Sequence, residues 1–215
     1  MVTAGPTYEK IDPVRFIGNY SSGKMGLAIA EELAGRGAEV VLVCGPVNLK
    51  THHPAIRRVD VESAAQMYEV TSREFANSDV AVLSAAVADF TPKEKADHKI
   101  KRGKDDLVLE LLPTKDIAAE LGKMKNASQL LVGFALETND EEVNALSKMQ
   151  RKNLDMIVLN SLNDKGAGFG VDTNKVTIMD KAGNRTVYEL KTKLEVAKDI
   201  VDQIASRPVS YTHLT

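Results

Sequence analysis

The chain has 215 residues, of which 43% are hydrophobic and 27% are charged, and its formal net charge is −2. This composition is typical of a globular protein with an apolar core, and the charge gives no general case for nucleic-acid binding. No apolar run approaches the roughly 18 residues that span a membrane, and a single cysteine, Cys44, excludes an internal disulfide and is typical of a reducing compartment such as the cytoplasm.

Strands and helices alternate along the sequence. Apolar residues four apart predict a helix over Lys24–Arg36, which Gly37 ends, and a continuous apolar run predicts a buried strand over Glu39–Cys44. The other predicted strands are Met1–Ala4, Val80–Val87, Leu107–Leu112, Leu130–Ala135, Met156–Asn160, Lys175–Met179 and Arg185–Leu190, and the other predicted helices are Ser63–Ala76, Asp116–Lys125, Asp140–Lys152 and Lys193–Ala205. This order predicts an α/β fold, a Rossmann-like, mainly parallel sheet flanked by helices, and the turn at Lys181–Asn184 predicts a late β-hairpin at its edge.

We predict one domain over residues 1–206, because neither a repeat nor a low-complexity linker divides the chain. Only Met1–Ala4 precede the first turn, so we expect a domain clipped from a longer protein. Residues 207–215 follow a complete helix and have no periodicity, and we interpret them as a non-native tail.

The segment Thr3–Gly26 is longer than an ordinary strand-to-helix turn, and loops of this length are usually functional. Ser21, Ser22 and Lys24 lie where the predicted helix begins, a position that suits a phosphate-like anion. The spacing G-x-x-x-x-G-K is present, but Met25 follows it where a P-loop needs Ser or Thr for Mg²⁺. The G-x-G-x-x-G dinucleotide fingerprint is also absent from this segment, so we predict a phosphate site of neither common kind.

Two residues of this loop carry suitable chemistry. The guanidinium of Arg15 is suited to clamp a phosphate or carboxylate of a substrate, or to tie the loop to a nearby acid. Asn19 is either a turn residue or a donor to charge that develops during a reaction. The residues alone leave these alternatives open.

Further candidates follow the other predicted strands, where ligands of parallel sheets gather. The small residues of Ser84–Ala88 let a planar base approach the backbone, and Asp89 is placed to meet a ribose hydroxyl or a metal. The charged run Pro92–Asp106 is either a solvated loop or a mobile lid that brings the cations of Lys99–Arg102 over a phosphate. His52, His53 and His98 lack accompanying acids or cysteines, so we do not expect them to bind a metal.

Phe134 leaves a predicted strand at the same edge, where its ring packs in the core or walls a nucleobase. Lys148 and Lys152 are four residues apart on one helix and share a face. Two like charges at this spacing repel each other unless an anion lies between them, so they are either a polyphosphate clamp or two solvated lysines.

The motifs together resemble a known family. The runs that carry the resemblance are TAGPTYEKIDPVRFIGNYSSGKMG, AAVADF, KIKR, GFALETN, RKNLDMIVLN and GFGVDTNKV. In their order they are similar to the phosphopantothenoylcysteine synthetase (phosphopantothenate–cysteine ligase) domain of the bacterial bifunctional coenzyme A biosynthesis protein. The resemblance covers about Val2 to Ile204 and implies that a fused N-terminal half, a decarboxylase with FMN, precedes this domain in the full protein.

The resemblance also implies an activity. Members of the family join 4′-phosphopantothenate to L-cysteine with CTP and Mg²⁺ through an acyl-cytidylate, and release diphosphate and CMP. They are cytoplasmic homodimers with active sites near the subunit interface, and neither nucleic acid nor a membrane is a partner. CTP rather than ATP rests on the resemblance alone, because no residue pattern reads the base.

Site residues follow from the motif match. We predict Asn19, Lys99 and Arg15 as catalytic residues, with Asn19 matching the residue of the acyl-cytidylate step. Arg15, Asn19 and Ala86 match positions that bind phosphopantothenate or lie near its acyl phosphate. The matched nucleotide-binding positions are Asp89, Lys99, Lys115, Asp116, Ile117, Ala118, Phe134, Lys148 and Lys152, with Lys115 standing where the family pattern has proline. We leave the metal ligands open and expect the nucleotide phosphates to hold most of the Mg²⁺.

Two other functions remain in view. A nucleotide-dependent oxidoreductase of Rossmann type is disfavoured by the missing glycine fingerprint and the missing ribose acid. A nucleotide-binding domain without catalysis is disfavoured by the charged lid and by the presence of both Asn19 and Lys99.

Overall fold

Eight strands form one central sheet in the order β13-β12-β10-β9-β6-β1-β4-β5. The computed structural model describes residues 1–103, 106–137, 139–161, 168 and 170–207. The strands are β1 (Val2–Ala4), β4 (Val40–Cys44), β5 (Ile56–Asp60), β6 (Val80–Leu83), β9 (Leu130–Glu137), β10 (Met156–Ser161), β12 (Val176–Asp180) and β13 (Arg185–Val187). The pairs from β5 through to β10 are parallel, and β12 and β13 add an antiparallel hairpin, so the predicted fold class is confirmed.

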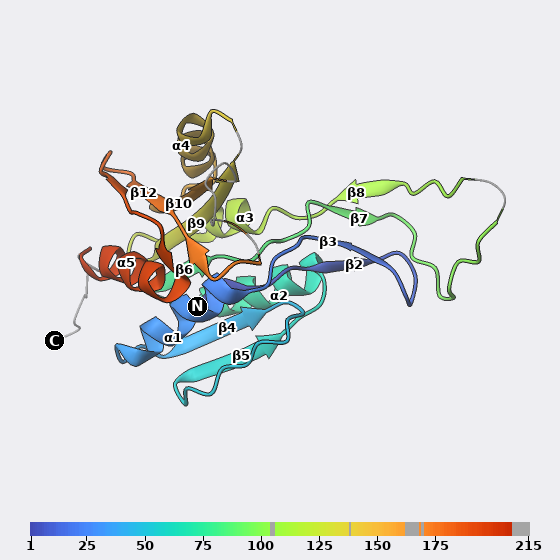
Figure 1. Ribbon diagram of the computed structural model, residues 1–215, viewed down its shortest axis with the longest axis horizontal. Helices are drawn as coiled ribbons and strands as arrows, with labels where there is room; N and C mark the ends of the chain where they lie inside the picture. The colour runs from blue at the N-terminus through green and yellow to red at the C-terminus, as the bar shows by residue number, and fades with distance from the viewer. Residues whose placement is uncertain (104–105, 138, 162–167, 169, 208–215) are drawn as a thin grey trace.

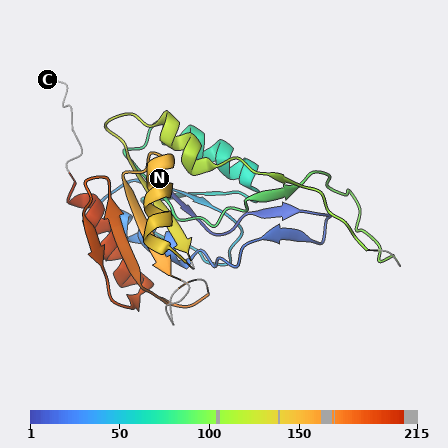
Figure 2. The ribbon, with the colours of Figure 1, turned by 90° about the horizontal axis from the view of Figure 1, so that it is seen from above.

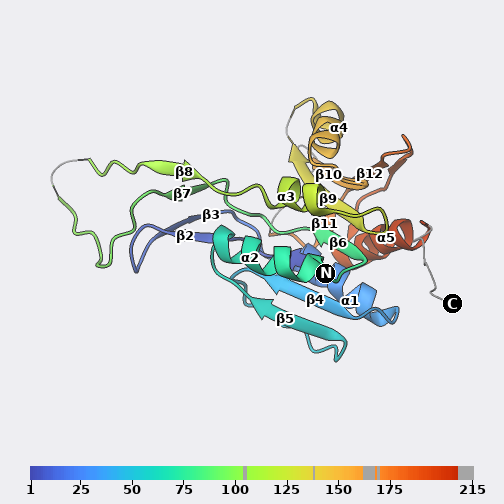
Figure 3. The ribbon, with the colours of Figure 1, turned by 180° about the vertical axis from the view of Figure 1, so that it is seen from behind.

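Helices cover both faces of the sheet (Figures 1 and 3). They are α1 (Lys24–Gly35), α2 (Ala64–Phe75), α3 (Ile117–Met124), α4 (Glu141–Arg151) and α5 (Lys193–Ala205). One core layer is built from α1 and α5 against the sheet, and the other from α2, α3 and α4. Since both faces are buried, the central strands are apolar along their length, which is why their sequence pattern was readable. No helix in the described part of the chain is long and apolar enough to cross a membrane.

Helix α1 lies unusually close to the first strand. A Cβ atom added at Gly26 would stand 2.6 Å from the Cβ of Ala4 and 2.9 Å from the carbonyl oxygen of Thr3. Only glycine permits this approach, which brings the beginning of α1 against the carboxyl end of β1.

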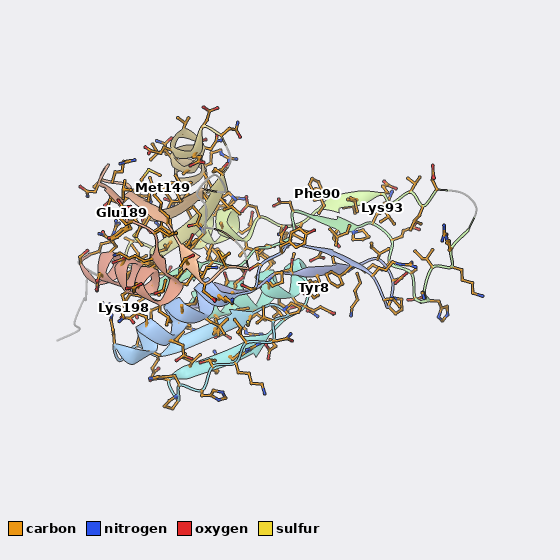
Figure 4. The ribbon with its side chains drawn as sticks, viewed as in Figure 1. Tyr8, Phe90, Lys93, Met149, Glu189 and Lys198 are labelled. Atoms are coloured by element: carbon orange, nitrogen blue, oxygen red, sulfur yellow. The ribbon has the colours of Figure 1, made fainter. Side chains whose placement is uncertain are left out.

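An arm of four short strands extends from the body of the molecule (Figures 1 and 2). It consists of residues 8–18 and 90–113, described apart from 104 and 105, with the antiparallel pairs β2 (Tyr8–Lys10) with β3 (Phe16–Gly18) and β7 (Phe90–Pro92) with β8 (Leu111–Pro113). The rings of Tyr8 and Phe16 stack at 3.7 Å between centroids. Tyr8, Phe90 and Lys93 are labelled along the arm in Figure 4, with Met149, Glu189 and Lys198 on the body.

The structure differs from the predicted elements in several places. The long loop contains β2 and β3, whose three-residue strands are too short to show a period of two. The edge strand β5 was not predicted, because its sequence, IRRVD, exposes charged residues on a half-covered strand. The predicted strand Leu107–Leu112 is wrong in extent and place, since only Leu111 and Leu112 lie in a strand and β8 belongs to the arm. The strand predicted to Val87 ends at Leu83.

A small ladder between β11 (Thr173–Asn174) and β14 (Lys191–Thr192) precedes the last helix. Thr192 caps α5 in a reciprocal pair with Glu195, as a helix of this sequence favours. The predicted non-native tail lies outside the described residues except for Arg207.

Candidate functional site

A cleft of about 460 Å³ opens at the carboxyl edge of β1, β6, β9 and β10. The lining comes from many separate stretches of chain, because parallel strands bring their following loops to one edge. Ten predicted site residues line it: Asn19, Ala86, Asp89, Lys115, Asp116, Ile117, Ala118, Phe134, Lys148 and Lys152.

The beginning of α1 forms one wall. Gly23 stands at the helix N-cap with φ of +75°, and no side chain caps the helix there. The free backbone N–H groups of a first helical turn attract anions, as the loop sequence predicts. Lys24 also lines the cleft, but its ammonium pairs with Asp172 at 2.6 Å.

Asn19 bridges the long loop to the segment after β6. Its side-chain amide nitrogen donates to the carbonyl oxygens of Ala86 and Val87, both at 3.1 Å. Ala86 in turn donates its N–H to the carbonyl of Gly5 at 2.9 Å. The side chain of Asn19 is therefore bonded to the backbone of the small-residue segment and is not simply a turn residue that points into solvent.

The lysine pair of α4 meets two different partners. Lys148 donates to the carbonyl oxygen of Phe134 at 2.9 Å, and Lys152 pairs with Asp116 at 2.8 Å. Burial, followed by the charge of Lys152, lowers the pKa of Lys148 below its ordinary value. Burial acts to raise the pKa of Asp116, but the bond from Lys152 outweighs it and the pKa is lowered. A buried ammonium beside a second cation favours an incoming anion.

Another wall of the cleft begins at the N-terminus of α3. Asp116 caps this helix by accepting from the N–H of Ala119 at 3.1 Å, and Ile117 is buried behind it. Lys115 lies over the ring of Tyr68, 4.3 Å from its centroid, so this predicted site residue is held by a cation–π contact. Within the described residues no ion pair engages the carboxylate of Asp89.

Arg15 and Lys99 do not line this cleft. Both lie on the arm, where the Arg15 guanidinium pairs with Asp12 at 2.8 Å and donates to the carbonyl of Ile100 at 3.2 Å. Of the two interpretations of Arg15, the tie to a nearby acid is therefore realised here. If Arg15 and Lys99 act in catalysis, the arm that carries them must reach a cleft in an arrangement other than the one in this single chain.

The sequence analysis missed several polar residues of the lining, among them Asn160, Asn174 and Lys193. Asn160 ends a predicted strand at the ligand edge, so its position contained the signal. Lys193 is buried and donates to the carbonyls of Gly168 and Val171 at 3.0 and 2.7 Å. Burial and then Lys24 lower its pKa. Only the tertiary fold brings this lysine, from the last helix, to the cleft.

Comparison with known proteins agrees with this geometry. The model of the DNA/pantothenate metabolism flavoprotein C-terminal domain matches residues 1–207. A relative from Bacillus subtilis, the coenzyme A biosynthesis bifunctional protein CoaBC, is 48% identical over 96% of this chain and 50% of its own length. A relative from an unknown prokaryotic organism, named cysteine/cysteine sulfinic acid decarboxylase, is 61% identical over 94% of this chain and 56% of its own.

A crystal structure of the C-terminal domain of a CoaBC protein superposes with a TM-score of 0.79 at 46% identity, covering 94% of this chain and 91% of that one. The present chain spans about half the length of the curated relatives that it matches. These matches confirm the resemblance drawn from the sequence motifs. Residues of the loop Thr3–Gly26, of the segment Ser84–Ala88 and of the pair Lys148 and Lys152 thus line one cleft. The chain belongs to the family of DNA/pantothenate metabolism flavoprotein C-terminal domains.

Proposed function

We propose that this chain is a ligase that joins 4′-phosphopantothenate to L-cysteine with CTP, in coenzyme A biosynthesis. The observation that carries the proposal is the convergence of Lys148, Lys152 and the uncapped start of α1 on one cleft, next to Asn19, in a chain of this family. Such a cleft suits a polyphosphate at one end and a small polar substrate at the other.

The chemistry has two steps. A carboxylate oxygen of phosphopantothenate attacks the α-phosphorus of CTP, the bond to the β-phosphate breaks, and diphosphate leaves. The cysteine amine then attacks the acyl carbon of the cytidylate, loses a proton and expels CMP. The first step brings negative charges together, so cations that face the phosphates lower its barrier. Lys148 and Lys152, which line the cleft, would perform that task, with Lys99 supplied from an arm.

Asn19 suits the acyl-cytidylate. Its amide nitrogen donates to the carbonyls of Ala86 and Val87, which holds the side chain against the small-residue segment where the reacting carboxyl group would lie. A rigidly held group that touches a high-energy intermediate costs little reorganisation at the moment of reaction.

Mg²⁺ enters with the nucleotide in this proposal. The described residues contain no cluster of three acids, histidines or cysteines able to hold a metal, and Asp116 is already paired with Lys152. This donor set fits a Mg²⁺ ion that is bound mainly by phosphates and water, with Asp89 as the carboxylate near it. When bound, the ion neutralises the phosphate charge.

We further propose that the active form is a homodimer. The arm exposes a row of large apolar side chains, among them Leu107 and Val108 at 57% and 86% exposure, together with Phe16 and Phe90. Exposed apolar rows of this kind mark protein contacts, and a second copy would bring an arm with Arg15 and Lys99 toward the cleft that lacks them. In the full protein the partner domain would be an N-terminal decarboxylase that binds FMN.

The name of the 61% identical relative suggests a second activity, decarboxylation of cysteine or its sulfinic acid. The present chain matches only part of that relative, so the activity in its name can belong to the part that has no counterpart here. Carbon dioxide release from either compound by the present chain alone would favour the decarboxylase.

The test is diphosphate release with 4′-phosphopantothenate, Mg²⁺ and either CTP or ATP, with and without L-cysteine. Release with CTP, and amide product only when cysteine is added, would support the ligase and its order of steps. Release with ATP alone would retain the ligase and overturn the choice of nucleotide. A folded dimer that releases no diphosphate with either nucleotide would sink the proposal.

A further inference from the structure

Asp12 is a buried acid in the arm. It lies in the turn between β2 and β3, and its side chain is 0% exposed. Carboxylates are rarely this buried unless hydrogen bonds replace the lost water. One oxygen accepts from the N–H groups of Val14 and Arg15, at 2.8 and 2.9 Å. The other accepts from the Arg15 guanidinium at 2.8 Å and from the N–H of Ile100 at 3.1 Å.

The bond to Ile100 joins two segments that are 88 residues apart. The same Arg15 nitrogen that pairs with Asp12 also donates to the carbonyl of Ile100 at 3.2 Å. Both backbone groups of Ile100 are therefore held by one acid–arginine pair. A third link runs from the N–H of Ala96 to the carbonyl of Ile11 at 2.9 Å. These bonds from residues 11–15 thereby set the backbone position of Lys99, which directly precedes Ile100.

The carboxylate charge is central to this arrangement. Burial acts to raise the pKa of Asp12, but bonds from Val14, Ile100 and Arg15 outweigh it and lower the pKa below 3.8. Asp12 is thus ionised at neutral pH, and its bonds are charge-assisted. An asparagine would keep the shape but lose the charge and direct an NH₂ group at donors, either at the Arg15 guanidinium and the N–H of Ile100 or at the N–H groups of Val14 and Arg15.

We propose that Asp12 is a positioning residue for the ligase reaction: with Arg15 it fixes the backbone of Ile100, so that Lys99 reaches the nucleotide already oriented. The inference rests on the proposed function, because that function gives Lys99 its target. Side chains that act in a transition state gain from being held in place beforehand. The lysine itself is exposed, so its backbone is what the protein can fix.

The first readout needs no activity. Trypsin cleaves after lysine, and the Lys99–Ile100 bond can be followed by mass spectrometry in the folded protein. Asp12→Asn is expected to speed this cleavage about tenfold or more, because protease needs a locally opened chain. Asp97→Asn is the matched control: it removes one exposed acid from the same segment and should leave the cleavage rate unchanged. If Asp12→Asn does not fold, Arg15→Met, at a half-exposed side chain, tests the same link by cleavage.

The second readout is the single-turnover rate of cytidylate formation. Asp12→Asn should lower this rate about tenfold or more while the Kd for CTP changes less. Combined with Lys99→Gln, it should slow the reaction no further than Lys99→Gln alone, since residues that act as a unit are not additive.

Three results discriminate. Unchanged cleavage and unchanged turnover in Asp12→Asn overturn the positioning role. Multiplied losses in the double variant overturn the route through Lys99 and leave Asp12 as a structural acid. Wild-type protein that releases no diphosphate overturns the ligase proposal itself, and the cleavage experiment then still reports whether Asp12 holds Ile100.

Discussion

The ammonium of Lys148 donates to the carbonyl oxygen of Phe134 across 2.9 Å, so a cation of α4 is fixed to the end of β9 on the cleft wall. The residue is half-buried, and burial together with Lys152 lowers its pKa. A charge in this position is unfavourable in the empty protein and becomes favourable beside a phosphate. The contact therefore links nucleotide binding to the protonation of one side chain.

Nucleotide binding should accordingly take up protons at alkaline pH. Between the lowered pKa of Lys148 and the ordinary value of 10.5, the free protein has lost this proton and the complex regains it. Affinity for CTP should fall as the pH rises through that window. Calorimetry in buffers of different ionisation heat measures the uptake, which should vanish in Lys148→Met. Lys198→Met, on the exposed side of α5, is the control and should behave as wild type.

Lys148→Met should also stabilise the protein without ligand. A lysine whose folded pKa lies below its unfolded pKa costs folding free energy while it is charged, and that cost disappears as pH rises through the window. Lys148→Met removes it at neutral pH, so thermal denaturation should show a higher Tm together with weaker nucleotide binding. A lower Tm of Lys148→Met without ligand would contradict the conclusion that the charged ammonium of Lys148 destabilises the fold.

Mixing inactive variants tests whether the arm acts on a second copy. Asn19→Asp damages the cleft and Lys99→Gln damages the arm, and each is expected to lose most of the turnover alone. If the arm of one subunit serves the cleft of the other, a mixed dimer has one intact site of two. Random mixing then restores roughly a quarter of wild-type activity, because half of the dimers are mixed. An arm that serves its own cleft would give no recovery after subunit exchange.

Asp155 should matter for stability and not for the reaction. Its carboxylate accepts from Lys125 at 2.6 Å and from the N–H of Leu131 at 2.7 Å, with only 18% and 8% of the Asp155 and Lys125 side chains exposed. Asp155→Ala leaves the buried ammonium of Lys125 without its carboxylate and the N–H of Leu131 without its acceptor, which should cost about 3 kcal/mol in chemical denaturation.

Acid should remove the same contribution from the wild type. Burial acts to raise the pKa of Asp155, but the bonds it accepts hold that pKa below 3.8. The stabilisation is present above 3.8 and is lost as the pH falls through the lower folded value. Glu120→Gln breaks the exposed pair with Lys123 and should cost less than about 1 kcal/mol. Equal losses in Asp155→Ala and Glu120→Gln would contradict this account.

Gly26→Ala should push α1 away from β1. The new methyl group would stand 2.6 Å from the Cβ of Ala4, which the packed layer cannot absorb without moving, at a cost of about 1–3 kcal/mol. Because the same turn forms a cleft wall, CTP binding should weaken as well. Gly35→Ala is the control at the other end of the helix, where an added Cβ meets open space. It should stabilise the protein slightly, by up to about 1 kcal/mol.

The sequence alone determined the fold class and most of the cleft. Strands buried on both faces have apolar runs that survive any tertiary context, as in Val40–Cys44, and parallel strands send their following residues to one edge. Asp89 and Phe134 were found in this way, since a rule about strand ends needs no distances, and Lys148 was found from its spacing of four from Lys152 on one helix. The order of the motifs then pointed to the family.

Only the tertiary structure decided how the remaining residues meet. Three-residue strands such as β2 and β3 carry no periodicity, so the arm was predicted as loop and lid. The pairing of Asp12 with Ile100 and the arrival of Lys193 at the cleft join segments far apart in the chain, and local pattern has no access to such contacts. Arg15 shows the limit best: its residue type suits an anion clamp and an internal tie equally, and the position of one buried carboxylate decides which partner it holds in this structure.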